Sequence, residues 1–304
     1  SAGYFVDTNG SIAQTPCSIG TWQDQSGQAS CTNASAGYYV DTNGSTTQTP
    51  CGLGTWNNMT GQSACTNASA GHYVDTNGST TQTPCDAGTY NPNSSSNSST
   101  DCLDTPAGNY SGLGASSPTQ CSPGTWQNQT GQSSCIDANP GHYASGFGNT
   151  NETQCALGTW TDQSGQSSCT PASPGYYVDT NGSTTQTPCD AGTYNPNSSS
   201  NSSTDCLDTP AGNYSGLGAS SPTQCSPGTW QNQTGQSSCI DANPGHYASG
   251  FGNTNETQCA LGTWTDQSGQ SSCTPASPGY YVDTNGSTTQ TPCGLGTWNN
   301  MTGQ

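Results

Sequence analysis

The sequence contains no lysine and no arginine, and this absence is the first constraint on its function. Its 304 residues carry 18 acidic side chains and a formal net charge of -18. Binding to nucleic acid or to an anionic membrane surface depends on clustered basic side chains. We therefore expect no nucleic-acid partner, and chemistry that needs a lysine or an arginine is excluded.

Large aliphatic residues are also scarce. Leu, Ile, Val and Phe together number 20, a poverty typical of disordered chains. The 17 cysteines and the aromatic residues recur at fixed intervals, however, which indicates a repeat and not a random polar tract. No apolar run approaches the roughly 18 residues of a membrane span, so we expect no direct membrane insertion. No secretory signal peptide is recognisable, and we expect any such signal to lie upstream.

The spacing of the cysteines defines the repeat. The gaps alternate around 14 and 20 residues, so the unit is about 34 residues long, and residues 85–188 recur without change at 189–292. A fixed period of this size indicates stacked supersecondary units. The predicted organisation is a partial repeat at 1–16, repeats at 17–50 and 51–84, a long repeat at 85–120, repeats at 121–154 and 155–188, a long repeat at 189–224, repeats at 225–258 and 259–292, and a partial repeat at 293–304.

Each repeat divides again into two halves of about 17 residues. Every half carries a glycine followed two residues later by an aromatic residue, and most carry a second glycine further on. We expect the aromatic residues to form an internal spine, with sugar stacking as the alternative role. The aromatic positions are Phe5, Trp22, Tyr39, Trp56, Tyr73, Tyr90, Tyr110, Trp126, Tyr143, Trp160, Tyr177, Tyr194, Tyr214, Trp230, Tyr247, Trp264, Tyr281 and Trp298.

The cysteines disappear in pairs, which indicates that they are bonded in pairs. In the second half of each repeat both positions are replaced together, for example by Ala34 and Gln48. Cysteine at this density implies an oxidising compartment and a disulfide scaffold. The predicted disulfides are Cys17–Cys31, Cys51–Cys65, Cys85–Cys102, Cys121–Cys135, Cys155–Cys169, Cys189–Cys206, Cys225–Cys239 and Cys259–Cys273. Cys293 remains; we expect its partner beyond Gln304, in a longer chain, and a free reactive thiol is the alternative.

The segments CGLGTWNNMTGQSAC (51–65) and CSPGTWQNQTGQSSC (121–135) resemble the ephrin-receptor-like cysteine-rich repeat, which is related to the one-disulfide modules of tumour-necrosis-factor receptors. The resemblance extends over the whole chain. It implies extracellular, rod-like tandem arrays of short strands and turns, with no catalytic residues. The chain differs from that family in its cysteine-free positions, its lack of basic residues and its richness in Asn, Ser and Thr, and these differences point to a glycosylated surface fibre.

The sequence holds 19 Asn-x-Ser/Thr acceptor motifs, about twice the number expected by chance. We expect N-linked glycans on several of them, although an Asn-Gly pair can also serve only as a turn. Clusters such as STTQTP (45–50) suit O-linked glycans. The candidate N-linked positions are Asn9, Asn33, Asn43, Asn58, Asn67, Asn77, Asn93, Asn97, Asn109, Asn128, Asn151, Asn181, Asn197, Asn201, Asn213, Asn232, Asn255, Asn285 and Asn300.

The remaining reactive residues do not form a recognisable catalytic or metal-binding motif. The three histidines, His72, His142 and His246, occupy a position that is tyrosine in other copies, so a general base or metal ligand is not expected there. Cys-x2-Cys zinc spacing and the GxSxG elbow are both missing. The DTNG segments lack the further acidic ligands of a calcium loop. We expect no enzyme activity, no metal and no cofactor other than covalent glycans.

Glycine, proline, asparagine, serine and threonine dominate the chain, which disfavours helix. The segment 38–48 alternates loosely and carries Asn43-Gly44, a strong signal for a hairpin. The expected fold is all-β and irregular: an elongated, disulfide-stapled rod of short strands and turns without helix. One half buries too little surface to fold alone, so neighbouring halves must stack.

These observations favour a structural extracellular glycoprotein at the cell surface. We expect it to associate with itself into filaments, as an appendage or surface-coat fibre stabilised by disulfides, aromatic stacking and glycans. The alternative is the rod-like stalk of a cell-surface receptor or adhesin whose ligand-binding domain lies elsewhere.

Overall fold

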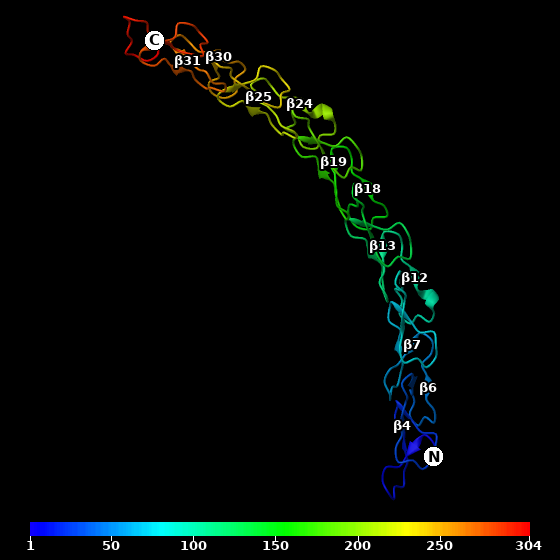
Figure 1. The fold of residues 1–304 in the computed structure, drawn as a ribbon. Helices are drawn as coiled ribbons and strands as arrows, with labels where there is room; N and C mark the ends of the chain where they lie inside the picture. Colours follow the sequence, from blue (N-terminus) through cyan, green and yellow to red (C-terminus); the bar gives the residue numbers. More distant parts are fainter. The chain divides into compact units, whose positions relative to one another are not determined.

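The computed structural model describes residues 1–304, and its regular structure consists of two-residue strands and two short 3-10 turns (Figure 1). The first strands are β1 (Tyr4–Phe5), β2 (Thr15–Pro16), β3 (Thr21–Trp22), β4 (Thr32–Asn33), β5 (Tyr38–Tyr39), β6 (Thr49–Pro50), β7 (Thr55–Trp56), β8 (Thr66–Asn67), β9 (His72–Tyr73), β10 (Thr83–Pro84), β11 (Thr89–Tyr90), β12 (Leu103–Asp104), β13 (Asn109–Tyr110), β14 (Thr119–Gln120), β15 (Thr125–Trp126) and β16 (Ile136–Asp137). The others are β17 (His142–Tyr143), β18 (Thr153–Gln154), β19 (Thr159–Trp160), β20 (Thr170–Pro171), β21 (Tyr176–Tyr177), β22 (Thr187–Pro188), β23 (Thr193–Tyr194), β24 (Leu207–Asp208), β25 (Asn213–Tyr214), β26 (Thr223–Gln224), β27 (Thr229–Trp230), β28 (Ile240–Asp241), β29 (His246–Tyr247), β30 (Thr257–Gln258), β31 (Thr263–Trp264), β32 (Thr274–Pro275), β33 (Tyr280–Tyr281) and β34 (Thr291–Pro292).

No α-helix forms, which confirms the all-β, irregular fold expected from composition. The two exceptions to extended or looped backbone are single 3-10 turns, η1 (Ser99–Asp101) and η2 (Ser203–Asp205), which lie in the two long halves. Each turn begins with a serine whose hydroxyl accepts a backbone N–H, and an aspartate three residues later bonds back to the serine backbone. This capping box explains why the extra residues of the long halves form a turn of helix.

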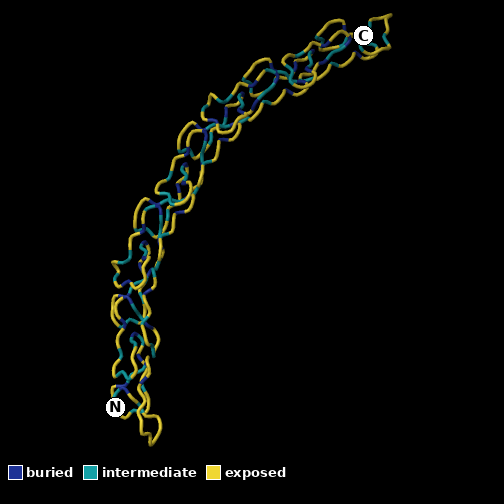
Figure 2. Tube along the Cα trace, turned by 180° about the vertical axis from the view of Figure 1, so that it is seen from behind, coloured by how far each residue is buried: buried dark blue, intermediate teal, exposed yellow.

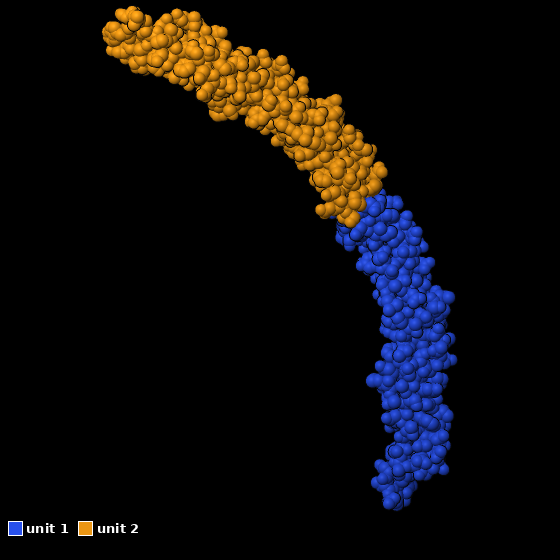
Figure 3. Space-filling model, in the orientation of Figure 1, with its two compact units in different colours: residues 1–139, 143–153, 165–167 blue, residues 140–142, 154–164, 168–304 orange.

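The chain divides into two units (Figure 3). One unit contains Ser1–Asn139, Tyr143–Thr153 and Gly165–Ser167, and the other contains Pro140–His142, Gln154–Ser164 and Ser168–Gln304. The same hairpin recurs within each unit, once for every half. The repeat period of the sequence is therefore also the period of the structure.

Each half forms one two-stranded antiparallel sheet. The aromatic residue and the residue before it form the first strand, and the two residues before the next Cys, Ala or Thr at the start of the following half form the second. In the half at 17–33, Trp22 pairs with Thr32 and Thr21 with Asn33. The Thr21 hydroxyl also donates to the Ser18 carbonyl at 2.7 Å, which closes the turn that leads into the first strand.

The hairpin expected from Asn43-Gly44 forms at 38–50, with a loop longer than two residues. Tyr39 pairs with Thr49, so the Asn-Gly pair lies inside a longer loop and does not directly connect the strands. The reason is a bond to the preceding half, because the Gly44 N–H donates to the Cys17 carbonyl at 2.8 Å. Gly44 has φ +72°, a conformation that glycine adopts without steric cost.

Four backbone hydrogen bonds join each half from 17–33 onward to the next one within a unit. They use the glycine that precedes the aromatic residue (the first glycine), the residue after the aromatic, the glycine of the loop (the second glycine) and the residue that begins each half (the closing position). Between the halves at 17–33 and 34–50 they are Gly20 N–H to Val40 O at 2.8 Å, Gln23 N–H to Ser45 O at 3.1 Å, Ala34 N–H to Gly20 O at 2.8 Å and Gly44 N–H to Cys17 O at 2.8 Å. Because only backbone atoms take part, these bonds tolerate sequence variation among the copies.

The first glycine also reaches the half after the next one. A Cβ atom built on Gly37 would overlap the carbonyl oxygen of Gly78, and the same holds for Gly20 and Gly61. Gly37 also has φ +82°. Both the backbone conformation and the lack of space therefore require glycine at this position.

Buried residues recur along the whole trace (Figure 2), and none of them is aromatic. The closing positions, such as Cys17 and Ala34, have no exposed surface, and the residue after the aromatic, such as Val40, is also buried. The aromatic side chains are only half-buried within the array. The expected internal aromatic spine is therefore wrong in this respect, because the fully buried positions are the closing residues and most of the residues that follow the aromatic ones are buried as well.

Candidate functional site

The disulfides are the covalent part of the repeat. They join Cys17–Cys31, Cys51–Cys65, Cys85–Cys102, Cys121–Cys135, Cys155–Cys169, Cys189–Cys206, Cys225–Cys239 and Cys259–Cys273, the same pairs that the alternating gaps predict. All have a Cα–Cα separation of 5.7 Å. In each internal pair the first cysteine is completely buried and the second is half-buried. Each disulfide thus closes its own half and joins no distant repeats.

The cysteine-free halves contain a hydrogen bond where the disulfide would be, a feature that sequence analysis missed. Gln48 stands at the position of the second cysteine, and its Oε1 accepts the Ser35 N–H at 2.7 Å. Its Nε2 lies 3.3 Å from the Ser35 hydroxyl, to which it donates. Because Ser35 follows the closing residue Ala34, the amide side chain spans the same gap that the disulfide spans elsewhere. We call this contact the amide clasp.

The amide clasp recurs in most cysteine-free halves. Gln82 accepts from Ser69, Gln186 from Ser173 and Gln290 from Ser277, at 2.7–2.8 Å. In two halves a glutamate takes this position: Glu152 Oε2 accepts the Asn139 N–H, and Glu256 Oε2 accepts the Asn243 N–H, both at 2.7 Å. Replacing the cysteine pair by Ala and Gln or Glu therefore replaces a disulfide by a hydrogen bond. The recurrence of Gln or Glu at the position of the second cysteine could have indicated this.

At Glu256 the side chain that closes the hairpin is a carboxyl group and not an amide. Partial burial acts to raise its pKa, but hydrogen bonds from the backbone and side chain of Asn243, with a favourable contribution from His246, hold the pKa of Glu256 below its ordinary value. The Asn243 Nδ2 donates to Glu256 Oε1 at 3.0 Å. The folded chain therefore favours the ionised carboxylate at this position.

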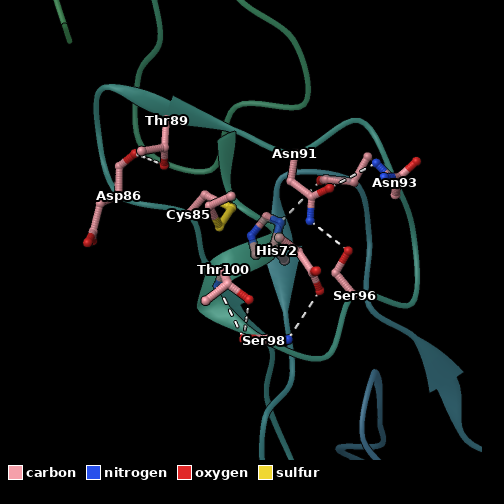
Figure 4. The surroundings of a disulfide bond; sticks show 12 residues. His72, Cys85, Asp86, Thr89, Asn91, Asn93, Ser96, Ser98 and Thr100 are labelled. Carbon is pink, nitrogen blue, oxygen red and sulfur yellow. Dashed lines mark hydrogen bonds between the residues drawn. A yellow bond between two sulfur atoms is a disulfide. The ribbon is translucent and has the colours of Figure 1, made fainter. Parts of the chain in front are cut away.

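The long half at 85–104 adds a polar interior to its disulfide (Figure 4). Asn91 is completely buried and donates through Nδ2 to the buried Ser96 hydroxyl at 2.7 Å. Ser95 occupies the position of the second glycine with φ 61°, and its N–H donates to the Ala68 carbonyl at 2.8 Å. The insertion therefore keeps the bond to the preceding half although a serine replaces glycine.

Most of the candidate glycosylation positions lie on the surface. Asn109 and Asn213 are half-buried, and the other asparagines of the acceptor motifs are exposed. The Asn109 Nδ2, the atom that a glycan would modify, donates to the Ala107 carbonyl at 3.1 Å. Ser111, the hydroxyl residue of that motif, is only 1% exposed. The acceptor motifs at Asn109 and Asn213 are therefore less accessible to a glycosylating enzyme than the other motifs.

The aromatic residues that recur in the halves are half-buried from Phe5 to Trp264. The indole N–H of Trp22 is enclosed without a hydrogen-bond partner, and the same is true of Trp56, Trp126, Trp160 and Trp264, whereas the Trp230 indole contributes to the lowered pKa of Glu256.

The remaining candidate residues lie apart from one another. His72, His142 and His246 each place Nδ1 3.3 Å from a carbonyl oxygen two residues earlier. Cys293 is half-buried and forms no disulfide. No three His, Cys, Asp or Glu side chains are grouped closely enough to hold a metal ion. A groove of about 260 Å³ is lined by Tyr247, Ala260, Thr263, Ser272 and Cys273.

No protein-family model matches the chain, and comparison with curated proteins finds no similar sequence. The structure contains no helix with the length and apolar character that crossing a membrane requires. The class that the fold defines is a cysteine-rich tandem-repeat protein, built from units of about 34 residues that each contain a disulfide-closed hairpin and a cysteine-free one. This architecture fits an extracellular structural protein, because disulfides persist in oxidising environments.

Proposed function

We propose that this protein is a structural extracellular glycoprotein that assembles with copies of itself into filaments of a surface coat or appendage, without enzymatic activity. The observation that carries the proposal is the set of four backbone bonds that each half makes to the next. In such an array every repeat contacts mainly its neighbours, so the number of repeats sets length. The resemblance to ephrin-receptor-like repeats supports the same extracellular setting.

The stiffness and durability of the filament follow from the two ways in which the hairpins are closed, by disulfides and by amide clasps. A disulfide closing a loop of about 15 residues contributes about 3 kcal/mol by restricting the unfolded chain. The amide clasps add hydrogen bonds in the halves between. The chain also lacks every cleavage site for proteases that require lysine or arginine.

Glycans supply the solubility that the chain itself lacks. Only 6% of the residues are charged, and leucine, isoleucine and phenylalanine side chains such as Leu113 and Phe147 are more than half exposed. The exposed acceptor asparagines would carry hydrophilic sugars on this surface. In this proposal the protein's partners are other copies of the same chain, and its glycans are covalently attached.

Electron microscopy of purified native material tests the filament. The expected result is a filament that contains many copies and whose density extends beyond the polypeptide at the acceptor asparagines. Single unassociated molecules attached to membrane would overturn the filament and favour a stalk. Intact mass before and after enzymatic deglycosylation tests the glycans separately, and an unchanged mass would remove them from the proposal.

A further inference from the structure

Each disulfide-closed half forms a junction with the cysteine-free half that follows it, and backbone bonds define that junction. In the repeat at 17–50 the Gly44 N–H donates to the Cys17 carbonyl and the Gly20 N–H donates to the Val40 carbonyl, both at 2.8 Å. Segment 18–19 of the first half therefore lies beside loop 41–43 of the second. The Ile19 N–H also donates to Asn43 Oδ1 at 3.1 Å, which brings these two residues together.

Every junction exposes one large apolar side chain, but the segment that supplies it changes. In four junctions an Ile or Leu stands two residues after the closing cysteine, and Asn precedes the second glycine of the facing loop. In the other four, Ala or Pro stands at the first position, and Leu or Phe precedes the glycine. The pairs are Ile19 and Asn43, Leu53 and Asn77, Ala87 and Leu113, Pro123 and Phe147, Leu157 and Asn181, Ala191 and Leu217, Pro227 and Phe251, and Leu261 and Asn285.

This alternation separates the pattern from ordinary surface variation. Single apolar residues scattered over a surface are normal. Here the apolar residue is retained at all eight junctions although two different positions of the repeat supply it. The retained feature is therefore an apolar group at the junction, and not a particular residue of the hairpin.

The four junctions that carry Leu or Phe in the loop lack both charge and a loop acceptor asparagine, and we call them the bare junctions. The loop reads DTNG where it carries Asn, GLG at 112–114 and SGFG at 145–148, so the aspartate and the asparagine are replaced together. Leu113 is 68% exposed and Phe147 is 69% exposed. The bare junctions are those at Leu113, Phe147, Leu217 and Phe251.

The surroundings of the bare junctions also differ from those of the other four. The half at 105–120 contains no charged residue, and its acceptor motif at Asn109 has a buried hydroxyl residue. In the half with Phe147 the acceptor lies instead at Asn151, beyond the second glycine and next to Glu152 of the clasp. A sugar on the DTNG loops would cover the junction directly, whereas the bare loops carry none.

We propose that the bare junctions are the contact sites at which a second copy of this chain docks. The inference rests on the proposed self-assembly and identifies its contact residues. Every copy carries a net charge of -18 and no basic side chain, so copies have no ionic attraction for one another. They approach with least repulsion where aspartate and sugar are both missing, and at those places each copy exposes Leu or Phe.

The repetition of the bare junctions also favours a second copy over an unrelated partner. Leu113 and Phe147 belong to one unit, and the identical pair Leu217 and Phe251 belongs to the other, 104 residues further along the chain. A partner that contacts both pairs needs apolar groups with the same separation along its own length. A second copy has that separation by identity. A basic partner would find no carboxylate in these loops.

One pair of bare junctions provides too little area for a stable complex by itself. A phenylalanine buries about 150–250 Å² when fully covered, whereas a specific interface buries about 1,200 Å² or more in total. Each contact is therefore weak. Two pairs on one chain act together, because the second contact becomes intramolecular once the first has formed.

The test measures self-association of the full chain, secreted with its disulfides and N-linked glycans, by sedimentation equilibrium. The bare-junction variant combines Leu113→Ser, Phe147→Ser, Leu217→Ser and Phe251→Ser. The matched control combines Ile19→Ser, Leu53→Ser, Leu157→Ser and Leu261→Ser, which remove the same number of exposed apolar residues from the other junctions. We expect the dissociation constant to rise at least about 100-fold in the bare-junction variant and less than about threefold in the control.

Hydrogen exchange of the wild-type chain gives a second measurement that needs no substitution. Association at high concentration should slow exchange in peptides that contain 111–116 and 145–149, relative to the dilute chain. Peptides that contain the DTNGS loops at 41–45 and 179–183 should exchange alike under both conditions. An unchanged thermal unfolding midpoint and eight intact disulfides verify that both variants are folded.

The outcomes separate this inference from the proposed function. A wild-type chain that associates, together with a folded bare-junction variant that associates equally well, would overturn the docking sites and leave self-assembly standing. Equal weakening by both variants would also overturn them, because apolar residues at any junction would then serve. A wild-type chain that stays single at every concentration would overturn both the docking sites and the filament.

Discussion

At the scale of single residues, the first glycine of each half combines two requirements that no other residue type meets. Gly37 has a left-handed backbone and faces the carbonyl oxygen of Gly78 without room for a Cβ. The second glycine has only the first requirement, since a Cβ on Gly78 would approach Pro50 Cβ at 3.7 Å, an ordinary contact. Ser95 and Ser199 occupy this second position at φ 61° and 60°, which agrees with its milder constraint.

We predict that Gly37→Ala destabilises the chain by at least about 2 kcal/mol, since the left-handed conformation costs about 1–2 kcal/mol and the overlap with a backbone carbonyl must also be relieved. Gly52→Ala is the matched control, because Gly52 has open space around it and no left-handed φ. Denaturant unfolding of the two variants provides the measurement. Equal destabilisation by both substitutions would contradict the steric argument.

The reverse substitution should stabilise the long half. Ser95→Gly removes the cost of holding a non-glycine residue at positive φ while retaining the N–H bond to Ala68. Glycine also gains freedom in the unfolded chain, so we expect a net gain of no more than about 1 kcal/mol. Thermal unfolding of Ser95→Gly beside Ser94→Gly distinguishes this local effect from a general tolerance of glycine in the loop.

The charge on Glu256 gives a pH dependence with a defined sign. Because folding lowers its pKa, its contribution to stability is complete above the ordinary carboxyl pKa of about 4.3 and is lost as the pH falls through the lower pKa of the folded chain. Solvent screening keeps this contribution below about 1 kcal/mol. Glu256→Gln should retain the amide clasp, as Gln48 does, and remove this part of the acid sensitivity.

The measurement is the free energy of unfolding of both proteins between neutral pH and pH values below the ordinary carboxyl pKa. The difference between wild type and Glu256→Gln should decline steadily over the acid part of that range. A difference that is independent of pH would show that ionisation of Glu256 does not contribute. His246 is present in both proteins, so it affects the comparison only through its interaction with Glu256.

At the scale of the element, one hairpin is closed in two chemically different ways. The disulfide joins residues 14 or 17 positions apart, and the amide clasp joins residues 13 positions apart. The strand pairing is the same in both, with the aromatic residue opposite a residue of the second strand. Closure and strand pairing are therefore separate features of the half.

We predict that Gln48→Ala lowers the free energy of unfolding by about 1 kcal/mol, the net value of a typical hydrogen bond. Gln48→Glu should cost less, because Glu256 makes the same contact in another half. Thr47→Ala, at the exposed neighbouring position, is the control and should change stability by no more than about 0.5 kcal/mol. If Gln48→Ala matches Thr47→Ala, the clasp makes no measurable contribution.

The hairpins and the disulfide framework could be predicted because cysteine, glycine and aromatic residues recur with the period of the fold. The burial pattern could not, because it depends on how closely successive halves approach: Ala34 is buried and Trp22 is only half-buried, the opposite of their hydrophobic areas. The clasp could not be predicted from the loss of the cysteine pair alone, because Gln48 reaches the Ser35 N–H only when the hairpin brings the two residues together. The position of Asn43-Gly44 also required knowledge of the bond between Gly44 and Cys17.

At the scale of the whole molecule, bonding between neighbours limits how far a local change can spread. Each half makes backbone bonds to the next one and steric contact with the one after that. Stability in such an array is approximately a sum of local and nearest-neighbour terms. A perturbation in one half should therefore be felt over about two halves in each direction and not along the entire chain.

The paired substitution Cys51→Ala with Cys65→Gln tests this range, because it converts a disulfide-closed half to the pattern of Ala34 and Gln48. We expect the hairpin to persist with lower local stability, since the loss of about 3 kcal/mol from the disulfide is only partly offset by about 1 kcal/mol from a new clasp. Hydrogen exchange measured on peptic peptides should accelerate in residues 51–67 and in the two halves on either side. Residues 121–137, which lie beyond that range in the same unit, should exchange as in the wild type. Acceleration that extends to 121–137 would show that the halves unfold together over a longer distance than their contacts span.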